Sequence, residues 1–242
     1  MNFIQNIYQE LKSALYCIDN PEVAREQWVE KQLSLLGDGQ LLLDAGCGPQ
    51  PYKKFYKHLK CKTQDFGAYD GKGNGSGMQN GEDWHYTKLD YTSDIWDIPE
   101  KDGTFDAILC TEVIEHIPYP NETLAEFSRL LKSGGKVILT APYACLPHMQ
   151  PYFFYSGFSE DYFKYMCEKN GMDILRLDKN GNAFTHVFQE YKRSYEHVDG
   201  LIGKALYLTI FVFAAPYLKF KAVTCKKETD LHFGFMLVAQ KK

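Results

Sequence analysis

The residues best suited to bind a ligand are two glycines and two aspartates that lie in or after one apolar segment. The run 41–45 contains Asp44 and ends at Gly46, and Gly48 follows after one intervening residue. Glycines at this spacing permit a tight turn and let the backbone pass close to a bound molecule. Asp65 lies 21 residues after Asp44, where a carboxylate would accept hydrogen bonds from the hydroxyls of a nucleoside ribose. The spacing indicates a nucleoside site, and a purely structural turn is the alternative.

The residue at position 51 narrows the class of ligand. The dinucleotide fingerprint G-x-G-x-x-G needs a third glycine at that position, and this chain has Pro51. A pyrophosphate held against a helix N-terminus is therefore disfavoured. A nicotinamide-dependent oxidoreductase is disfavoured for the same reason.

The elements that position these residues alternate between strands and helices. Asn20 and Pro21 predict the start of a helix that ends at Gly37, and the segment 121–135 predicts an amphipathic helix. Apolar runs predict strands at 41–45, 61–66, 87–91, 105–110, 136–140 and 233–239. Strand, helix and strand at this spacing indicate parallel βαβ units, so we expect a doubly wound, Rossmann-like α/β sheet with helices on both faces. Binding sites in such sheets lie at the carboxyl ends of the strands.

Composition limits the class of protein. The chain has 242 residues, 45% of them hydrophobic, and a net charge of −4, as expected for a soluble globular protein. A mildly acidic chain without a basic run argues against a nucleic-acid partner. Its seven cysteines include no C-x-x-C pair, and its first residues lack a signal-peptide pattern, so we expect reduced thiols and a cytoplasmic location. We find no zinc-ligand spacing and predict no metal site.

Five motifs in order carry a family resemblance. The segments LLLDAGCGPQPY, QDF, LDYTSDIWDIP, FDAILCTEVIEHIP and LLKSGGKVILTAP resemble the motif series of class I S-adenosylmethionine-dependent methyltransferases. The E-H-I-P segment is similar to that of a small bacterial-type branch. The resemblance covers roughly residues 21 to 180, and FGFMLVAQKK fits the family's seventh, antiparallel strand. Many members have a third glycine where this chain has Gln50.

The resemblance implies a set of residues that bind S-adenosyl-L-methionine, whose product form is S-adenosyl-L-homocysteine. Asp44 would orient the loop and hold the cofactor's ammonium through water. Gly46 and Gly48 would let the backbone pass close to the methionine portion. Asp65 would accept hydrogen bonds from both ribose hydroxyls, and Phe66 would lie against the adenine.

Further along the chain, the same resemblance implies further contacts with the cofactor, at its adenine and at its sulfonium. Asp94 and Ile95 would meet the adenine through a carboxylate and a backbone N–H. Thr111 and Glu112 would line the sulfonium end. A turn in which Asp94 caps its own backbone is the alternative for that residue.

The residues after the fifth strand resemble the family segment that closes over the substrate. His148 is the candidate catalytic base, because an ordinary imidazole titrates near neutral pH. Tyr143, Tyr152, Tyr155 and His116 are candidate substrate-binding residues. A loop histidine and core aromatics are the alternatives, and a helix-start position that packs against the loop is the alternative for His116.

The apolar segment 201–218 allows three interpretations. We favour a buried helix that covers the sheet or the pocket, over a homodimer interface and over a membrane-surface contact. It is shorter than the roughly 20 apolar residues of a membrane span. We expect a single domain over 1–242, divided into N-terminal helices (1–37), a cofactor-binding core (38–180), a helical insertion (181–226) and a final strand (227–242).

The resemblance favours an enzyme that moves a methyl group to a small-molecule or saccharide acceptor. We expect transfer to oxygen by in-line displacement without a metal. The alternative is a non-catalytic protein that kept the fold to bind the cofactor or to assemble with a partner. Methylation of nucleic acid is disfavoured, because Glu112–Glu115 stands where an N-P-P-[YF] segment would follow the fourth strand.

Overall fold

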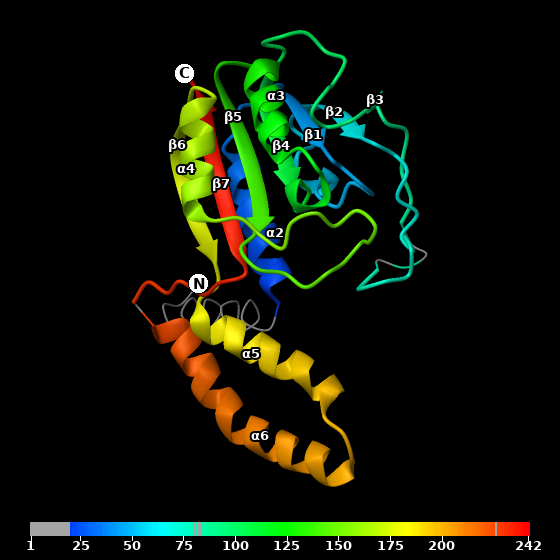
Figure 1. Cartoon of the computed structure of the whole chain (residues 1–242). Coiled ribbons are helices and arrows are strands. Elements are labelled where there is room, and N and C mark those ends of the chain that lie inside the picture. The colour runs from blue at the N-terminus through cyan, green and yellow to red at the C-terminus, as the bar shows by residue number, and fades with distance from the viewer. Residues whose placement is uncertain (1–19, 80, 82–83, 226) are drawn as a thin grey trace. The chain divides into compact units, whose positions relative to one another are not determined.

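Seven strands form a single sheet (Figure 1). The computed structural model describes residues 20–79, 81, 84–225 and 227–242. The strands are β1 (Leu41–Ala45), β2 (Lys60–Asp65), β3 (Tyr91–Thr92), β4 (Phe105–Thr111), β5 (Leu131–Pro142), β6 (Met172–Asn180) and β7 (Gly234–Lys241). Their order is β3-β2-β1-β4-β5-β7-β6, with parallel pairing from β3 to β5 and with β7 antiparallel to β5. The predicted doubly wound sheet with an antiparallel last strand is confirmed.

Helices cover both faces of the sheet because each central strand sends alternate apolar residues to opposite sides. On one face, Leu43 and Ile108 pack with α3 (Pro120–Leu130) and α4 (Glu160–Lys169). On the other, Leu42 and Leu109 pack with the α2 helix (Pro21–Ser34). Three residues of α2 and one just after it belong to this second core: Trp28, Val29, Leu33 and Leu36.

Two of the expected elements differ from the structure. The strand expected at 87–91 is reduced to the two-residue β3 at 91–92, since the preceding segment carries polar residues and pairs with β2 only at its end. The helix expected over 121–135 stops at Leu130, where the chain becomes extended and begins β5. Gly134 and Gly135 lie inside that strand. Gly134 has a φ of 78° and belongs to an irregular stretch of the pairing with β4, so the two glycines do not end the helix.

The chain divides into two compact units. Among the described residues, one unit lies within 26–178 and 234–242 and contains most of the sheet, and the other lies within 20–25 and 179–233. Part of the predicted N-terminal region 1–37, namely residues 1–19 with Cys17, lies outside the described residues. The other six cysteines are free thiols.

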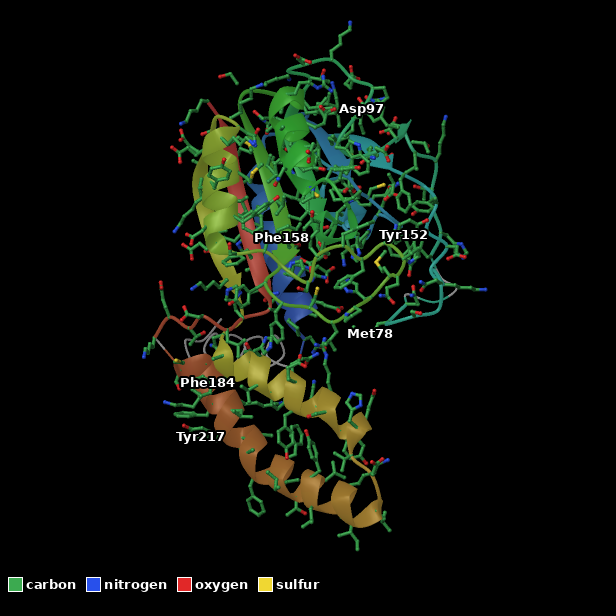
Figure 2. The ribbon with its side chains drawn as sticks, viewed as in Figure 1. Met78, Asp97, Tyr152, Phe158, Phe184 and Tyr217 are labelled. Carbon is green, nitrogen blue, oxygen red and sulfur yellow. The ribbon has the colours of Figure 1, made fainter. Side chains whose placement is uncertain are left out.

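The smaller unit contains a helical hairpin made by α5 (Ala183–Ser194) and α6 (Leu201–Thr224). Aromatic rings join the two helices: Tyr191 stacks on Phe211 at 5.3 Å between ring centroids, and Phe184 meets the ring of Tyr217 edge-on at 6.5 Å (Figure 2). An Asn182 capping box fixes the start of α5. The expected helical insertion is therefore present as a pair of antiparallel helices.

The buried-helix interpretation of residues 201–218 is wrong. No residue of α6 is buried, and the side chains of Phe213 and Ile202 are 78% and 77% exposed. α6 contacts α5 along one side, and the two-helix hairpin is too small to enclose its other apolar side chains. Among the described residues, α6 is the one helix long and apolar enough, by length and composition alone, to cross a membrane.

Candidate functional site

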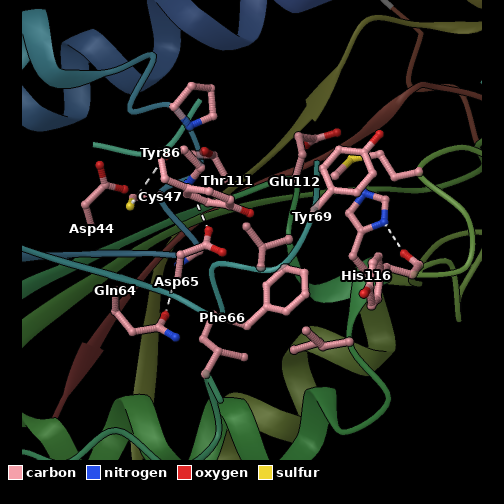
Figure 3. A pocket seen from close by; sticks show the side chains of 18 of the residues that line it. Asp44, Cys47, Gln64, Asp65, Phe66, Tyr69, Tyr86, Thr111, Glu112 and His116 are labelled. Carbon is pink, nitrogen blue, oxygen red and sulfur yellow. Dashed lines mark hydrogen bonds between the residues drawn. The ribbon is translucent and has the colours of Figure 1, made fainter. Parts of the chain in front are cut away.

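A cavity of about 390 Å³ lies at the carboxyl ends of β1, β2 and β4 (Figure 3). This is the edge at which open α/β sheets bind ligands. All nine residues that the sequence predicts as cofactor ligands lie on its wall: Asp44, Gly46, Gly48, Asp65, Phe66, Asp94, Ile95, Thr111 and Glu112. The fold thus brings together residues from four separate motifs, and their individual roles stay predictions.

The turn after β1 is possible only with glycine at two positions. Gly46 and Gly48 have φ angles of 66° and 49°, in the left-handed region that other residues enter at a cost. A Cβ at Gly46 would lie 2.6 Å from a methyl carbon of Val113, and one at Gly48 would lie 2.8 Å from the Trp84 ring. Gln50, where many relatives of the resembled family have glycine, adopts a φ of 59°. Its side-chain amide donates to the Thr87 hydroxyl.

Asp65, at the end of β2, is fixed by the backbone of both neighbouring turns. Its Oδ2 accepts the N–H of Gly48 at 2.9 Å and its Oδ1 accepts the N–H of Gly67 at 3.0 Å. The residue is 5% exposed. A carboxylate oxygen has two lone pairs, so each oxygen keeps one for a ligand hydroxyl. The two backbone hydrogen bonds therefore fix the Asp65 carboxylate so that each of its oxygens can accept one further hydrogen bond from a ligand.

Asp44 is buried at the end of β1 beside Tyr56. The Tyr56 hydroxyl donates to its Oδ2 at 2.9 Å. Burial and the nearby Asp65 charge raise the pKa of Asp44 to about 7, and the hydrogen bond from Tyr56 partly opposes this. A cationic ligand group beside Asp44 would lower that pKa again, so ligand binding at this position is coupled to proton release.

The far wall of the cavity follows β3 and β4. Asp94 and Ile95 come from the turn after β3, and Thr111 and Glu112 end β4. Glu112 has a φ of 53°, and its carboxylate accepts the Thr140 hydroxyl at 2.8 Å. This bond fixes the Glu112 side chain at the cavity wall.

Two loops close the remaining side of the cavity with aromatic rings. Phe66 and Tyr152 meet edge-on at 5.0 Å, and Tyr69 meets Trp84 edge-on at 5.1 Å. In its described residues, 67–79 and 81, the glycine-rich segment before β3 forms neither a helix nor a named strand. It pairs with the loop after β5 through a bridge between Met78, labelled in Figure 2, and His148.

Two imidazoles meet at the edge of the cavity. The ring centroids of His116 and His148 are 4.6 Å apart, and Nδ1 of His116 donates to the Tyr152 carbonyl at 2.6 Å. His116 lines the cavity, and His148 lies outside the lining residues. Burial lowers the pKa of His116 to about 4, with the neighbouring His148 acting in the same direction and the Tyr152 carbonyl opposing it. The His116 ring is therefore neutral at neutral pH.

Only some of the predicted catalytic and substrate-binding residues line the cavity. Tyr152 and His116 lie on the cavity wall, whereas His148, Tyr143 and Tyr155 do not. Tyr143 packs edge-on against Phe235 at 6.1 Å, and the Tyr155 hydroxyl donates to the Pro118 carbonyl at 3.2 Å. Roles of these two tyrosines in substrate binding stay predictions.

Several wall residues were not predicted from the sequence. Gln64 accepts the Gly46 N–H at 3.1 Å through its side-chain carbonyl, and its place beside Asp65 was the available signal. Of the others, Tyr69, Trp84 and Tyr86 come from segments without a recognisable pattern, and the rest lie within the segments that carry the family resemblance: Cys47, Pro49, Pro51, Tyr52, Trp96, Val113, Ile117, Pro118, Met149 and Phe154. Burial and the Asp65 charge hold the pKa of Tyr86 above its usual range.

Comparisons with known proteins agree with this fold. Residues 43–139 match the family model described as a methyltransferase domain. The chain is 25% identical over 161 residues to the ubiquinone biosynthesis O-methyltransferase of Dechloromonas aromatica, and 46% identical over 41 residues to the protein of that name from Xanthomonas oryzae. The first match covers 64% of each protein and the second 17% of each. The chain thus spans less than two thirds of these curated relatives.

Solved structures share the fold at low sequence identity. A geranyl diphosphate methyltransferase in complex with geranyl diphosphate and sinefungin superposes with a TM-score of 0.56 at 15% identity, covering 91% of this chain and 79% of that one. The [4+2]-cyclase SpnF superposes with a TM-score of 0.51 at 17% identity, covering 88% and 80%. One fold therefore serves two reaction types, and the chemistry has to be argued from the site.

Proposed function

Since the chain belongs to the class I S-adenosylmethionine-dependent methyltransferases, we propose that it transfers a methyl group to a hydroxyl oxygen of a small-molecule or sugar-containing acceptor. The observation that carries the proposal is the cavity at the strand ends, whose wall holds Asp44, Asp65 and Asp94 together. Transfer to oxygen is further supported by relatives named O-methyltransferases. A protein that had lost this cofactor would have no need of three acids on one wall.

The residues on the sheet side fit the cofactor. Asp65 presents one lone pair on each oxygen toward the cavity, which suits the two hydroxyls of a ribose. Asp44 offers a buried carboxylate for an ammonium group, and Gly48 lets the backbone approach closely. When bound, S-adenosylmethionine supplies a sulfonium methyl group, which an oxygen accepts as the carbon–sulfur bond breaks with its electron pair on sulfur.

The loop side fits an acceptor held by rings. Phe66, Tyr152 and Phe154 give this wall an apolar, aromatic surface, and His116 is the titratable group among them. A hydroxyl acceptor has to lose its proton at or near transfer. His148, 4.6 Å from His116, stays the predicted proton acceptor. Retained turnover with unchanged cofactor affinity in His148→Ala would remove His148 from the mechanism.

Thermal unfolding with S-adenosylhomocysteine, and separately with NAD, tests the assignment. A ligand at about 100 times its dissociation constant adds roughly 2.7 kcal/mol to the free energy of unfolding. For a chain of this size the unfolding midpoint rises by several degrees. We expect this rise with S-adenosylhomocysteine alone. A rise with NAD alone, or with neither ligand, would contradict the proposal, and cofactor binding without methylation of any hydroxylated acceptor would favour the non-catalytic alternative.

The exposed surface of α6 supports a membrane-surface contact, which would bring the enzyme to a lipid-linked acceptor. Its exposed apolar residues include Phe213 and Ile202, which suit burial at the boundary between headgroups and acyl chains. Such peripheral binding is compatible with the predicted cytoplasmic location. A homodimer formed through α6 is the alternative.

Sedimentation with phosphatidylglycerol vesicles tests this contact. We expect the chain to pellet with the vesicles and Phe213→Glu to stay in solution. Leu175→Glu introduces the same charge at a residue of β6 that is 52% exposed and is expected to pellet like the parent. Equal pelleting of Phe213→Glu would contradict the membrane contact. A dimer in analytical ultracentrifugation that Phe213→Glu dissociates, without vesicle binding, would favour the interface.

A further inference from the structure

Three potential metal ligands converge beside the cavity. One ligand atom each from Glu115, His116 and His148 lies within 4.8 Å of the other two. Two ligand atoms held at about 2.1 Å from one tetrahedral ion lie about 3.4 Å apart. A movement of under about 1 Å per ligand atom would therefore bring all three atoms into one coordination sphere.

The hydrogen bonds of the two rings leave the lone pair of Nε2 available to a metal. Nδ1 of His116 faces the Tyr152 carbonyl at 2.6 Å, and Nδ1 of His148 faces the Leu146 carbonyl at 2.9 Å. A carbonyl oxygen only accepts, so each Nδ1 must carry the proton. The lone pair is then on Nε2 in both rings. Carbonyl groups that orient ligand imidazoles in this way are the usual outer shell of protein metal sites.

The third ligand is a buried carboxylate held in place by its own backbone. Glu115 is 0% exposed, and its Oε1 is 3.7 Å from Nε2 of His116. The Glu115 carbonyl accepts the N–H groups of Phe154 and Tyr155 at 3.0 and 3.1 Å. These bonds join the segment after β4 to the loop that carries His148. Both sources of ligands are thus fixed relative to each other before any ion binds.

We propose that Glu115, His116 and His148 form a binding site for one divalent transition-metal ion, with zinc as the reference ion. Two imidazoles and one carboxylate are a donor set used in catalytic zinc sites, where a further coordination position stays open. No sequence spacing predicted this site, because His148 follows a separate strand and joins the pair only through the fold.

The open position would face the acceptor. His116 belongs both to the metal cluster and to the cavity wall, so the ion would lie at the margin of the cavity. A divalent ion lowers the pKa of a coordinated hydroxyl, and the released proton passes to solvent. His148 then acts as a ligand rather than as the direct proton acceptor. This role in activating a hydroxyl rests on the proposed function, whereas ion binding itself does not.

Metal titration of the chelator-treated full chain tests the site. Zn²⁺ binding is followed by calorimetry, and Co²⁺ binding by the visible absorption that reports its nitrogen ligands. We expect one ion per chain, with affinity lowered about 100-fold or more in His148→Gln, because loss of an outer-shell partner alone costs 10–100-fold. Glu115→Gln keeps the shape of the buried side chain and should give a similar loss. His85→Gln, another loop histidine, should bind metal like the parent.

The same samples separate this site from the proposed function. The metal site would be overturned if the parent did not bind Zn²⁺. It would also be overturned if a folded His148→Gln variant bound Zn²⁺ as tightly as the parent. Circular dichroism and the unfolding midpoint establish that the variants are folded. S-adenosylhomocysteine binding without metal binding overturns the metal site alone. Metal binding without S-adenosylhomocysteine binding overturns the methyltransferase proposal and supports the metal site.

Discussion

The sheet side and the loop side of the cavity hold their residues by different means. On the sheet side, Asp44 and Asp65 lie at the carboxyl ends of neighbouring parallel strands, where the register sets Asp44 beside Thr63, two residues before Asp65. On the loop side, Trp84 precedes β3 and Tyr152 belongs to the loop after β5, and both are positioned by ring contacts with Tyr69. Under the proposed function, cofactor recognition is set by the sheet, while acceptor recognition depends on how two loops pack. Substitutions on the two sides should therefore separate cofactor binding from turnover.

Removal of the Asp65 carboxylate should have the largest effect. Asp65→Ala takes away a charged acceptor of two ribose hydroxyls, and hydrogen bonds to charged groups contribute about 1.5–3 kcal/mol each. We expect S-adenosylhomocysteine affinity to fall about 100-fold or more, measured by calorimetry. Asp161→Ala removes the same charge from the exposed start of α4 and should leave affinity unchanged. Equal affinities for Asp65→Ala and the parent would show that the cofactor is not held by the sheet side.

A methyl group at Gly48 should weaken the cofactor site next most strongly. Gly48→Ala forces a left-handed residue that costs roughly 1–2 kcal/mol and pushes against the Trp84 ring. Cofactor affinity should drop about tenfold or more, because the turn must move. Gly39→Ala is a matched control, since Gly39 has a φ of 75° but no atom within 4 Å of its added Cβ. It should lower the unfolding midpoint without changing affinity.

The pH dependence of cofactor affinity should report Asp44. Its pKa in the free protein is raised to about 7, and the cofactor's ammonium favours the ionised form. Affinity is therefore full above this pKa and falls as the pH decreases through it, by about tenfold at one unit below. Calorimetry across this range measures the profile. In Asp44→Asn this pH dependence of the affinity should disappear. If the variant kept the pH profile of the parent, the dependence would belong to another titratable group.

Loosening the loop side should have the smallest effect on the cofactor. The side-chain carbonyl of Gln79 accepts the Tyr69 hydroxyl at 2.9 Å, and its amide donates to the Gln150 carbonyl at 3.3 Å. We expect Gln79→Ala to keep S-adenosylhomocysteine affinity within about twofold and to lower turnover several-fold. Met78→Ala is the control, because Met78 pairs through its backbone. A loss of cofactor affinity in Gln79→Ala would abolish the distinction between the two sides.

The same distinction explains how far the sequence could be interpreted. Apolar runs and glycines identify β1, β2 and β4, and the parallel register then fixes which residues meet at their ends. All nine predicted cofactor ligands consequently line one cavity. The identities of Trp84, Tyr86 and Met149 as wall residues depend on loop packing, for which no period or spacing gives a signal.

Two features that the sequence did not predict have a common physical cause. Residues 201–218 are apolar, and an apolar helix is normally buried, but a two-helix hairpin has too little surface to enclose them. His116 and His148 lack ligand spacing, and only the loop after β5 brings their rings together. In both cases the residue types were interpreted correctly, but the local sequence does not show which other part of the chain these residues will contact.

The position of β7 has a consequence for synthesis of the chain. β7 lies between β5 and β6 in the sheet, yet the ribosome makes it after both of them and after the hairpin of α5 and α6. Until residues 234–241 emerge, the inner edges of β5 and β6 have no partner, and unpaired edges promote association between chains. Pairing of β5 with β7 also joins segments about 100 residues apart, so the sheet closes late and slowly. Nascent chains of this protein are therefore most exposed to aggregation while the hairpin is being translated.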